Sequence, residues 1–201
     1  MPTPSATRPA RERLLTAAAE LFYEGGIAAT GVDAVLRRAG VAPATMYAHF
    51  AGKDALVAAY LQERHERWRA IWDEVLQQCT DPAARPLSVF DAVARYREQE
   101  GNRRGCGFLA AATELPGGHP GQTWLAADSR LLTERLHTLA QEAGADDPGS
   151  LAGELLLLYD GALARYARYA TTPELAHEDP LPAARRLAEI VVQRHFGSTH
   201  D

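Results

Sequence analysis

Three side chains suited to nucleic-acid contact, Tyr47, His49 and Lys53, lie within seven residues of one another. A phenol hydroxyl and an imidazole can donate hydrogen bonds to phosphate oxygens, and an ammonium pairs with their charge. Thr45 adds a hydroxyl and a methyl group that suit a base edge. Lys53 is the only lysine of the chain, and it opens a helical pattern whose N-terminus favours an anion. These residue types predict contacts with DNA.

Two short helices joined by a tight turn must position these groups. In residues 30–50, Thr30 is expected to cap the first helix, with Asp33 at the spacing of a capping box. Gly40 suits the left-handed residue that ends a helix, and Pro43 suits the first turn of the next. This order predicts a helix-turn-helix, whose second helix enters the major groove of DNA.

The second of these helices has an inward and an outward face. Val41, Met46 and Phe50 are expected to pack inward. The methyl group of Ala44 could touch a thymine methyl. Neither Ala42 nor Ala48 can hydrogen-bond a base, so more of the specificity is expected to come from DNA shape. The predicted DNA-binding residues are Thr30, Pro43, Ala44, Thr45, Tyr47, Ala48, His49 and Lys53.

The chain resembles the tetracycline-repressor (TetR-like) family of transcription regulators. The resemblance rests on residues 11–24 and 30–50, and on the order aromatic, His, Phe, Lys, acid, Leu over residues 47–56. Weaker similarity covers residues 104–109 and 155–162. The family's matching positions contact DNA. Two residues depart from its pattern, because Ala42 replaces the usual Ser or Thr cap and Ala48 an often large residue.

The resemblance implies a homodimeric repressor that binds a double-stranded DNA operator and is released by an unidentified small-molecule effector. A two-fold dimer implies a palindromic operator with half-sites about one helical turn, or a multiple of it, apart. We expect neither a cofactor nor a metal.

Composition favours an all-α chain of two parts. Of its 201 residues 46% are hydrophobic, and residues that favour strands are sparse. We expect residues 1–52 to form the helix-turn-helix domain with a disordered N-terminal arm, and residues 53–201 to form a larger helical domain for ligand binding and dimerisation. The expected helices cover residues 9–24, two stretches within 30–50, and 53–78, 87–100, 108–115, 122–143, 149–169 and 181–196.

The net charge of −5 opposes DNA binding, but it is unevenly distributed. Residues 1–53 carry six basic and four acidic side chains, a net charge of +2, which leaves −7 for the rest. A cationic head on an acidic body would orient the protein on DNA.

The two C-terminal helical patterns suggest a dimer interface, because the first is apolar on nearly all sides. Two such helices from each subunit would form a four-helix bundle. The alternative is that both helices merely complete a monomer's core. The residues expected at the interface are Leu155, Leu158, Ala162, Tyr166, Leu187 and Val191.

Aromatic residues spread over the larger domain suggest the wall of a ligand pocket, although the same residues also suit a core. Two polar residues flank the glycine- and proline-rich loop 116–121. The residues expected to bind a ligand are Trp68, Trp72, Tyr96, Phe108, Glu114, His119, Trp124 and Tyr159.

Two other functions stay open. A metal-dependent helical enzyme would use the Glu-x-x-His pairs at 134–137 and 174–177, but the second lies between two prolines. A helical adaptor would use the helix-turn-helix only for packing. Motifs for a nucleotide or a serine nucleophile are missing, so we expect no enzyme. Two cysteines are too few for a disulfide framework. Without a signal peptide or a membrane-spanning run, a cytoplasmic protein that does not bind membranes is expected.

Overall fold

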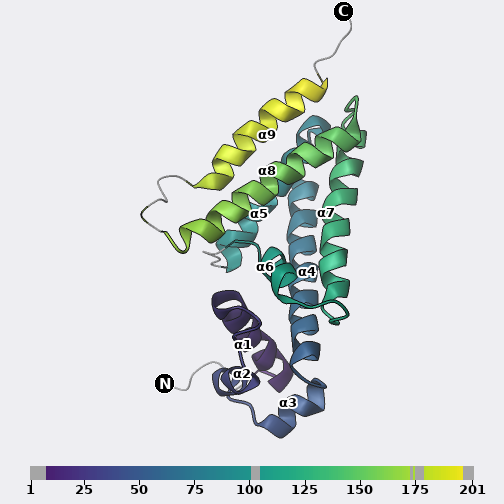
Figure 1. Cartoon of the computed structure of the whole chain (residues 1–201). Coiled ribbons are helices and arrows are strands. Elements are labelled where there is room, and N and C mark those ends of the chain that lie inside the picture. The colour runs from purple at the N-terminus through teal and green to yellow at the C-terminus, as the bar shows by residue number, and fades with distance from the viewer. Residues whose placement is uncertain (1–7, 101–104, 173, 175–178, 197–201) are drawn as a thin grey trace, which may run out of the picture. The chain divides into compact units, whose positions relative to one another are not determined.

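The computed structural model describes residues 8–100, 105–172, 174 and 179–196, and within these ranges the chain is helical and has no strand. Figure 1 shows the order of the helices along the chain. They are α1 (Ala10–Gly25), α2 (Val32–Ala39), α3 (Pro43–His49), α4 (Lys53–Gln78), the 3-10 helix η2 (Pro82–Leu87), α5 (Ser88–Glu100), α6 (Gly107–Glu114), α7 (Gln122–Glu142), α8 (Pro148–Tyr169) and α9 (Pro180–Phe196). The expected helices are therefore confirmed. The 3-10 helix η2 was not expected, because its two prolines, Pro82 and Pro86, predicted an interruption between helices.

These residues form two compact units, whose boundary differs from the expected one. The first unit comprises Met1–His65 and Gly107–Ala126, and the second comprises Glu66–Cys106 and Ala127–Asp201. The first unit extends into α4 because the beginning of that helix packs on α1, where the rings of Phe22 and Tyr60 lie 5.6 Å apart. The expected disordered arm falls on residues 1–8, of which 1–7 lie outside the described residues.

In the first unit, α1 packs against both α2 and α3. Leu14, Leu15 and Ala18 of α1 are fully buried, as are Leu56 and Leu61 of α4. Since helices of seven or eight residues are marginal alone, this packing stabilises α2 and α3.

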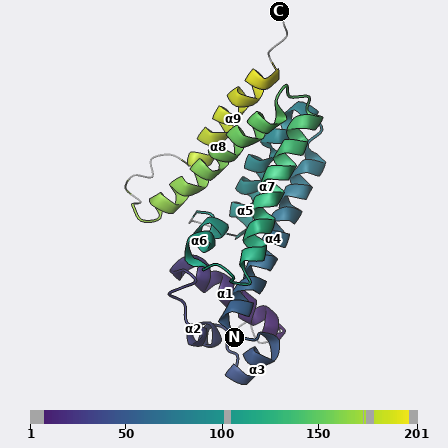
Figure 2. The ribbon, with the colours of Figure 1, turned by 45° about the vertical axis from the view of Figure 1, so that its right-hand side comes forward.

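The second unit has a continuous hydrophobic core. It contains side chains from α4, α5, α7, α8 and α9, with Trp72 and Phe90 almost completely excluded from solvent. Figures 1 and 2 both show α8 and α9 side by side. In the described ranges, no helix is long and apolar enough to cross a membrane.

The core of the second unit contains one hydrogen bond whose loss we expect to be costly. The indole nitrogen of Trp72 donates to the hydroxyl of Ser88 over 2.9 Å, and both side chains are buried. Ser88→Ala leaves the indole N–H without this acceptor and should lower the free energy of unfolding by about 1–3 kcal/mol. Urea denaturation measures this change. Thr138→Ala, on the exposed face of α7, is the control and should stay within about 0.5 kcal/mol. Equal stability of the two variants would contradict the assignment.

Candidate nucleic-acid interface

The turn between α2 and α3 is held by its own backbone and by α1. Gly40 has φ 60°, the left-handed conformation expected of it, and Val41 donates its backbone N–H to the carbonyl of Leu36 over 3.2 Å. The guanidinium of Arg13 donates to the carbonyls of Ala39 and Gly40 over 3.1 and 3.0 Å. Because these carbonyls end α2, a cation here also opposes the negative end of the helix dipole. The turn therefore fixes the angle at which α3 follows α2.

One face of α3 is buried and the other is exposed, as expected. Met46 is fully buried, and Val41 and Phe50, at the two ends of the helix, are buried as well. The side chain of Tyr47 is 59% exposed, and Thr45 is half-buried. The other exposed residues of this face are Pro43, Ala44, Ala48 and His49. Ala42 is the N-cap residue of α3, and its side chain makes no capping hydrogen bond.

The expected capping role of Thr30 is wrong. The N-cap of α2 is Gly31, and it makes no side-chain hydrogen bond. Thr30 is buried, and its hydroxyl donates instead to the carbonyls of Gly26 and Leu21, over 2.7 and 3.2 Å. Its side chain therefore closes the loop between α1 and α2 and is not presented on the exposed face of the unit.

Lys53 is the first residue of α4, as expected. Its ammonium nitrogen lies 3.3 Å from the backbone carbonyl of Ala28, to which it donates a hydrogen bond. An ammonium has three N–H donors, so this bond leaves two for other acceptors.

The charge of the first unit differs from the expected cationic head. Within the bounds of this unit the sequence holds seven basic and seven acidic side chains, so the net charge is zero. Asp54, Glu63, Arg64 and Glu114 belong to the unit and cancel the excess of the first 53 residues. The second unit then carries the whole charge of −5.

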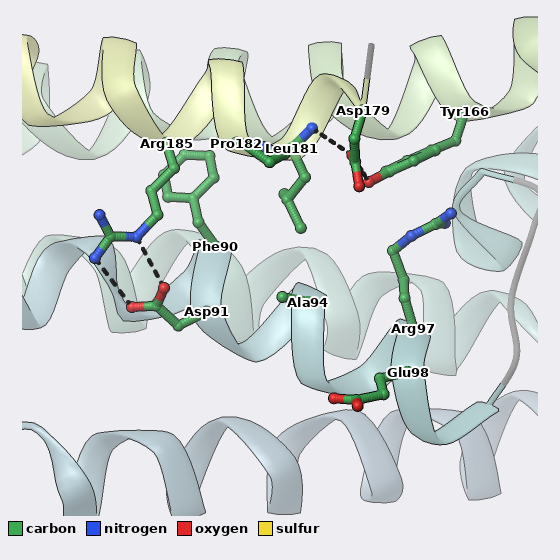
Figure 3. Close-up of a pocket in the computed structure, with 10 residues that line it drawn as sticks. All are labelled: Phe90, Asp91, Ala94, Arg97, Glu98, Tyr166, Asp179, Leu181, Pro182 and Arg185. Atoms are coloured by element: carbon green, nitrogen blue, oxygen red, sulfur yellow. Dashed lines mark hydrogen bonds and ion pairs between the residues drawn. The ribbon is translucent and has the colours of Figure 1, made fainter. Parts of the chain in front are cut away.

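A pocket of about 510 Å³ lies between α5, α8 and the beginning of α9 in the second unit. Figure 3 shows apolar side chains in its middle and polar groups at both ends. At one end, the guanidinium of Arg185 pairs with Asp91 over 2.8 Å. At the other, Arg97 lies 3.3 Å above the ring of Tyr166, whose hydroxyl donates to Asp179. The apolar lining consists of Phe90, Ala94, Leu181 and Pro182.

Burial and the hydrogen bond to Asp179 raise the pKa of Tyr166 to about 12. The phenol therefore stays protonated at neutral pH and keeps donating to that carboxylate. The hydrogen bond between Tyr166 and Asp179 thus holds this polar end of the pocket in place at neutral pH.

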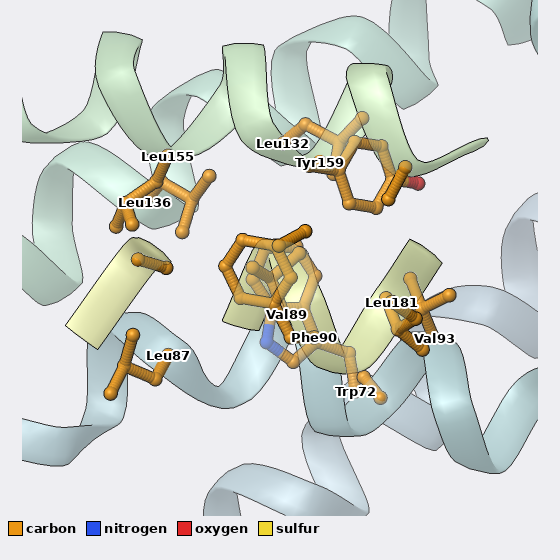
Figure 4. Packing of buried hydrophobic residues seen from close by; sticks show 14 of the residues in the cluster. Trp72, Leu87, Val89, Phe90, Val93, Leu132, Leu136, Leu155, Tyr159 and Leu181 are labelled. Carbon is orange, nitrogen blue, oxygen red and sulfur yellow. The ribbon is translucent and has the colours of Figure 1, made fainter. Parts of the chain in front are cut away.

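None of the eight residues expected to bind a ligand is among those that line this pocket. Trp68 packs on Trp72, Tyr96 and Tyr159, with ring centres 5.5, 5.9 and 6.3 Å apart. Figure 4 shows Trp72 and Tyr159 within the core. The sequence could not reveal the pocket, because the ion pair at its edge joins residues 94 positions apart.

The other four expected ligand residues belong to the first unit. Phe108 and Trp124 contact the buried ring of His65, at 6.5 and 5.8 Å between centres. Glu114 accepts a hydrogen bond from the backbone N–H of Ala28 over 2.7 Å. The Nδ1 atom of His119 accepts from the N–H of Gly121 over 2.9 Å, and its Nε2 atom lies 3.4 Å from Asp54. Both polar side chains therefore have partners inside the unit.

The expected dimer interface needs correction. Leu155, Ala162 and Tyr166 are buried in the chain's own core, and Leu158 and Val191 pack partly against it. Of the six expected residues, only Leu187 is an exposed large hydrophobic side chain (52%). Leu157 (75%) and Ile190 (56%), which were not among the six, are exposed as well. Four consecutive leucines at 155–158 hide the helix rotation, so the sequence could not distinguish the two faces of α8.

Metal binding finds no support in the described residues, where no group of three or more His, Cys, Asp or Glu side chains could hold an ion. His177 of the second Glu-x-x-His pair lies outside these residues.

The sequence and fold of this chain are similar to those of known proteins. The family model of bacterial regulatory proteins of the tetR family matches residues 14–60. The transcriptional regulator UidR of Escherichia coli is 34% identical over 70 residues, which cover 35% of this chain and 36% of UidR. The chain is thus matched to about a third of the length of this curated relative.

Solved structures extend the similarity over most of the chain. The TetR-type transcriptional regulator sav143 from Streptomyces avermitilis is 33% identical, with 90% of this chain and 99% of that chain covered and a TM-score of 0.69. SCO4454, a TetR-family regulator from Streptomyces coelicolor, is 28% identical with a TM-score of 0.81, covering 92% of this chain and 95% of that one. The likeness therefore includes the second unit as well as the helix-turn-helix.

Lys53→Ala should weaken binding to DNA of any sequence and reduce the slope of log affinity against log salt concentration by about one unit. The reason is that the two remaining N–H donors of the ammonium can bind a phosphate. Titration of a fluorescent duplex at four salt concentrations measures the slope. Arg69→Ala, which removes a cation from the second unit, is the control and should leave the slope unchanged. A wild-type slope in Lys53→Ala would exclude the phosphate contact.

Proposed function

Because this chain belongs to the TetR family of bacterial regulatory proteins, we propose that it is a homodimeric, sequence-specific DNA-binding regulator of transcription that releases a palindromic operator when a small molecule binds. The first unit binds the major groove through α3. The second unit dimerises and holds the effector. Repression is the proposed direction of regulation.

The observation that carries DNA binding is the division of α3 into two faces. Its buried face anchors the helix through Met46, while the opposite face exposes Tyr47 and His49 together with small residues. Exposed alanines let the helix approach base edges closely, and the hydroxyl of Tyr47 can donate to a phosphate. The packing of α3 in the unit thus favours a recognition helix over a helix used for packing alone.

The exposed apolar residues of α8 and α9 support the homodimer. Leu157 has a glycine four residues before and after it, Gly153 and Gly161. A Cβ atom placed on either glycine would have no neighbour within 4 Å apart from the adjacent residues and the backbone of α8 itself. Residues four apart share a helix face, so this face has a leucine between two positions of close approach. Leu187 and Ile190 form a second exposed apolar pair on α9. A second copy that packs on both helices would bury all three side chains.

The pocket of the second unit supports the effector. A volume of about 510 Å³ suits a small organic molecule, and the polar ends with an apolar middle are typical of ligand sites. Arg97, Tyr166 and Asp179 would orient the polar part of the ligand, while Phe90 and Leu181 would contact its apolar part.

Selection of bound duplexes from a random DNA pool tests the whole proposal. Enrichment of a two-fold palindrome by the purified protein is the expected result. No enrichment by a folded dimer would contradict the proposal and favour the adaptor.

For the dimer, Leu157→Glu should shift the protein toward monomer, because the interface would have to bury an unpaired charge. Sedimentation equilibrium should show at least a tenfold higher dissociation constant, which corresponds to about 1.4 kcal/mol. Leu109→Glu changes an equally apolar residue, exposed on α6 in the first unit, and should leave the dimer intact. Dimerisation of Leu157→Glu at wild-type strength would contradict the proposed interface.

For the effector, Ala94→Trp should fill the pocket and block release while leaving DNA binding intact, because Ala94 lines the cavity and is exposed to it. A compound library is first screened for molecules that release wild-type protein from the selected duplex. Each active compound should then need at least about tenfold higher concentration with Ala94→Trp. Ala83→Trp, on the exposed side of η2, is the control and should respond like wild type. Unchanged release from Ala94→Trp would place the effector elsewhere.

A further inference from the structure

The loop between α1 and α2, residues 26–31, is held by two side chains from outside the helix-turn-helix. Both backbone polar groups of Ala28 are bonded. Its N–H donates to the Oε2 atom of Glu114 over 2.7 Å, and its carbonyl accepts from the ammonium of Lys53 over 3.3 Å. Glu114 is the last residue of α6, and Lys53 is the first of α4. We call these two contacts on Ala28 the loop clamp.

The loop backbone comes close to Glu114 at a second point as well. Gly26 has φ 87°, and a Cβ placed on it would lie 3.2 Å from the Oε1 atom of Glu114. Only glycine adopts this φ without strain, so the loop can lie against the carboxylate only with glycine here. On the far side of the loop, Thr30 bonds back to the carbonyls of Gly26 and Leu21. The loop is thus held in its middle by Glu114 and Lys53, and near its end by Thr30.

The position of this loop determines the position of the recognition helix. The loop leads directly into α2, and only residues 40–42 separate α2 from α3. Because that turn is itself bonded to α1 through Arg13, a displaced loop would displace α2 and α3 together. A misplacement of about 1 Å is enough to break well-aligned hydrogen bonds to DNA.

We propose that Glu114 is a positioning residue for DNA binding, which acts by fixing the loop between α1 and α2 through Ala28. The inference rests on the proposed DNA-binding function. The direction in which DNA affinity changes on mutation of Glu114 separates this role from a simple effect of charge. Removing a carboxylate from a DNA-binding unit should strengthen binding by lowering repulsion of phosphate, whereas loss of the loop clamp should weaken binding.

The test compares Glu114 variants on the duplex enriched from the random pool, at several salt concentrations. Glu114→Ala should bind about tenfold more weakly with an unchanged salt slope, because a charge-assisted hydrogen bond is lost but no phosphate contact. Glu114→Gln keeps a carbonyl acceptor and should recover most of the affinity. Glu63→Gln is the matched control. It removes the same charge from the same unit, and Glu63 has no partner among the described residues, so binding should stay equal or become tighter.

A double-mutant cycle checks that the two side chains act on one loop. Lys53→Ala and Glu114→Ala should be non-additive, because either change alone releases one side of Ala28. Circular dichroism establishes folding of each variant, and Glu114→Met, similar in length but without an oxygen acceptor, takes the place of Glu114→Ala if that variant is unfolded.

Wild-type affinity of Glu114→Ala, or tighter binding, would overturn the role of Glu114 while leaving DNA binding intact. Failure of the wild-type protein itself to bind any duplex would instead overturn the proposed function.

Discussion

Burial of one face of α3 is the interaction on which the candidate interface depends. Helices of eight and seven residues, such as α2 and α3, form too few internal hydrogen bonds to persist alone. Met46 and Phe50 attach α3 to the apolar centre of the first unit, which α1 and the start of α4 also form. The opposite face can then expose Tyr47 and small residues because it contributes little to stability. The same packing that folds the unit therefore presents the groups that can contact DNA.

In the second unit, too, a helix buries one face and exposes the other. α8 is apolar on nearly all sides, and the structure buries only the side that carries Leu151, Leu155 and Tyr159. Leu157 stays in solvent at 75% exposure. Burial of this exposed apolar surface by a second copy is favourable by about 25 cal/mol for each Å² removed from water. The hydrophobic effect that forms the core thus also favours association.

Most local signals in the sequence predict the structure, whereas contacts between distant residues leave no pattern in the sequence. Gly40 and Pro43 identified the turn and the start of α3, because their backbone preferences act within a few residues. Thr30 also follows a local pattern, yet tertiary contacts prevailed, since its hydroxyl reaches carbonyls of the loop and of α1. The contact of Glu114 with Ala28 spans 86 residues and has no sequence pattern that could reveal it. The same limit applies to the pocket, whereas the rotation of α8 was hidden by a local ambiguity, the four consecutive leucines at 155–158.

The charge balance explains why geometry matters so much in this protein. Non-specific DNA affinity arises mainly from phosphate neutralisation by basic residues. The first unit has no net charge and the second carries −5. The net charge therefore gives little long-range attraction to DNA, or even repels it. Few direct base contacts are available either, since Ala44 and Ala48 cannot hydrogen-bond. We therefore propose that binding depends on the accurate placement of a few groups, above all Tyr47, His49 and Lys53. A protein of this kind gains more from a rigid loop behind its recognition helix than a strongly basic one would.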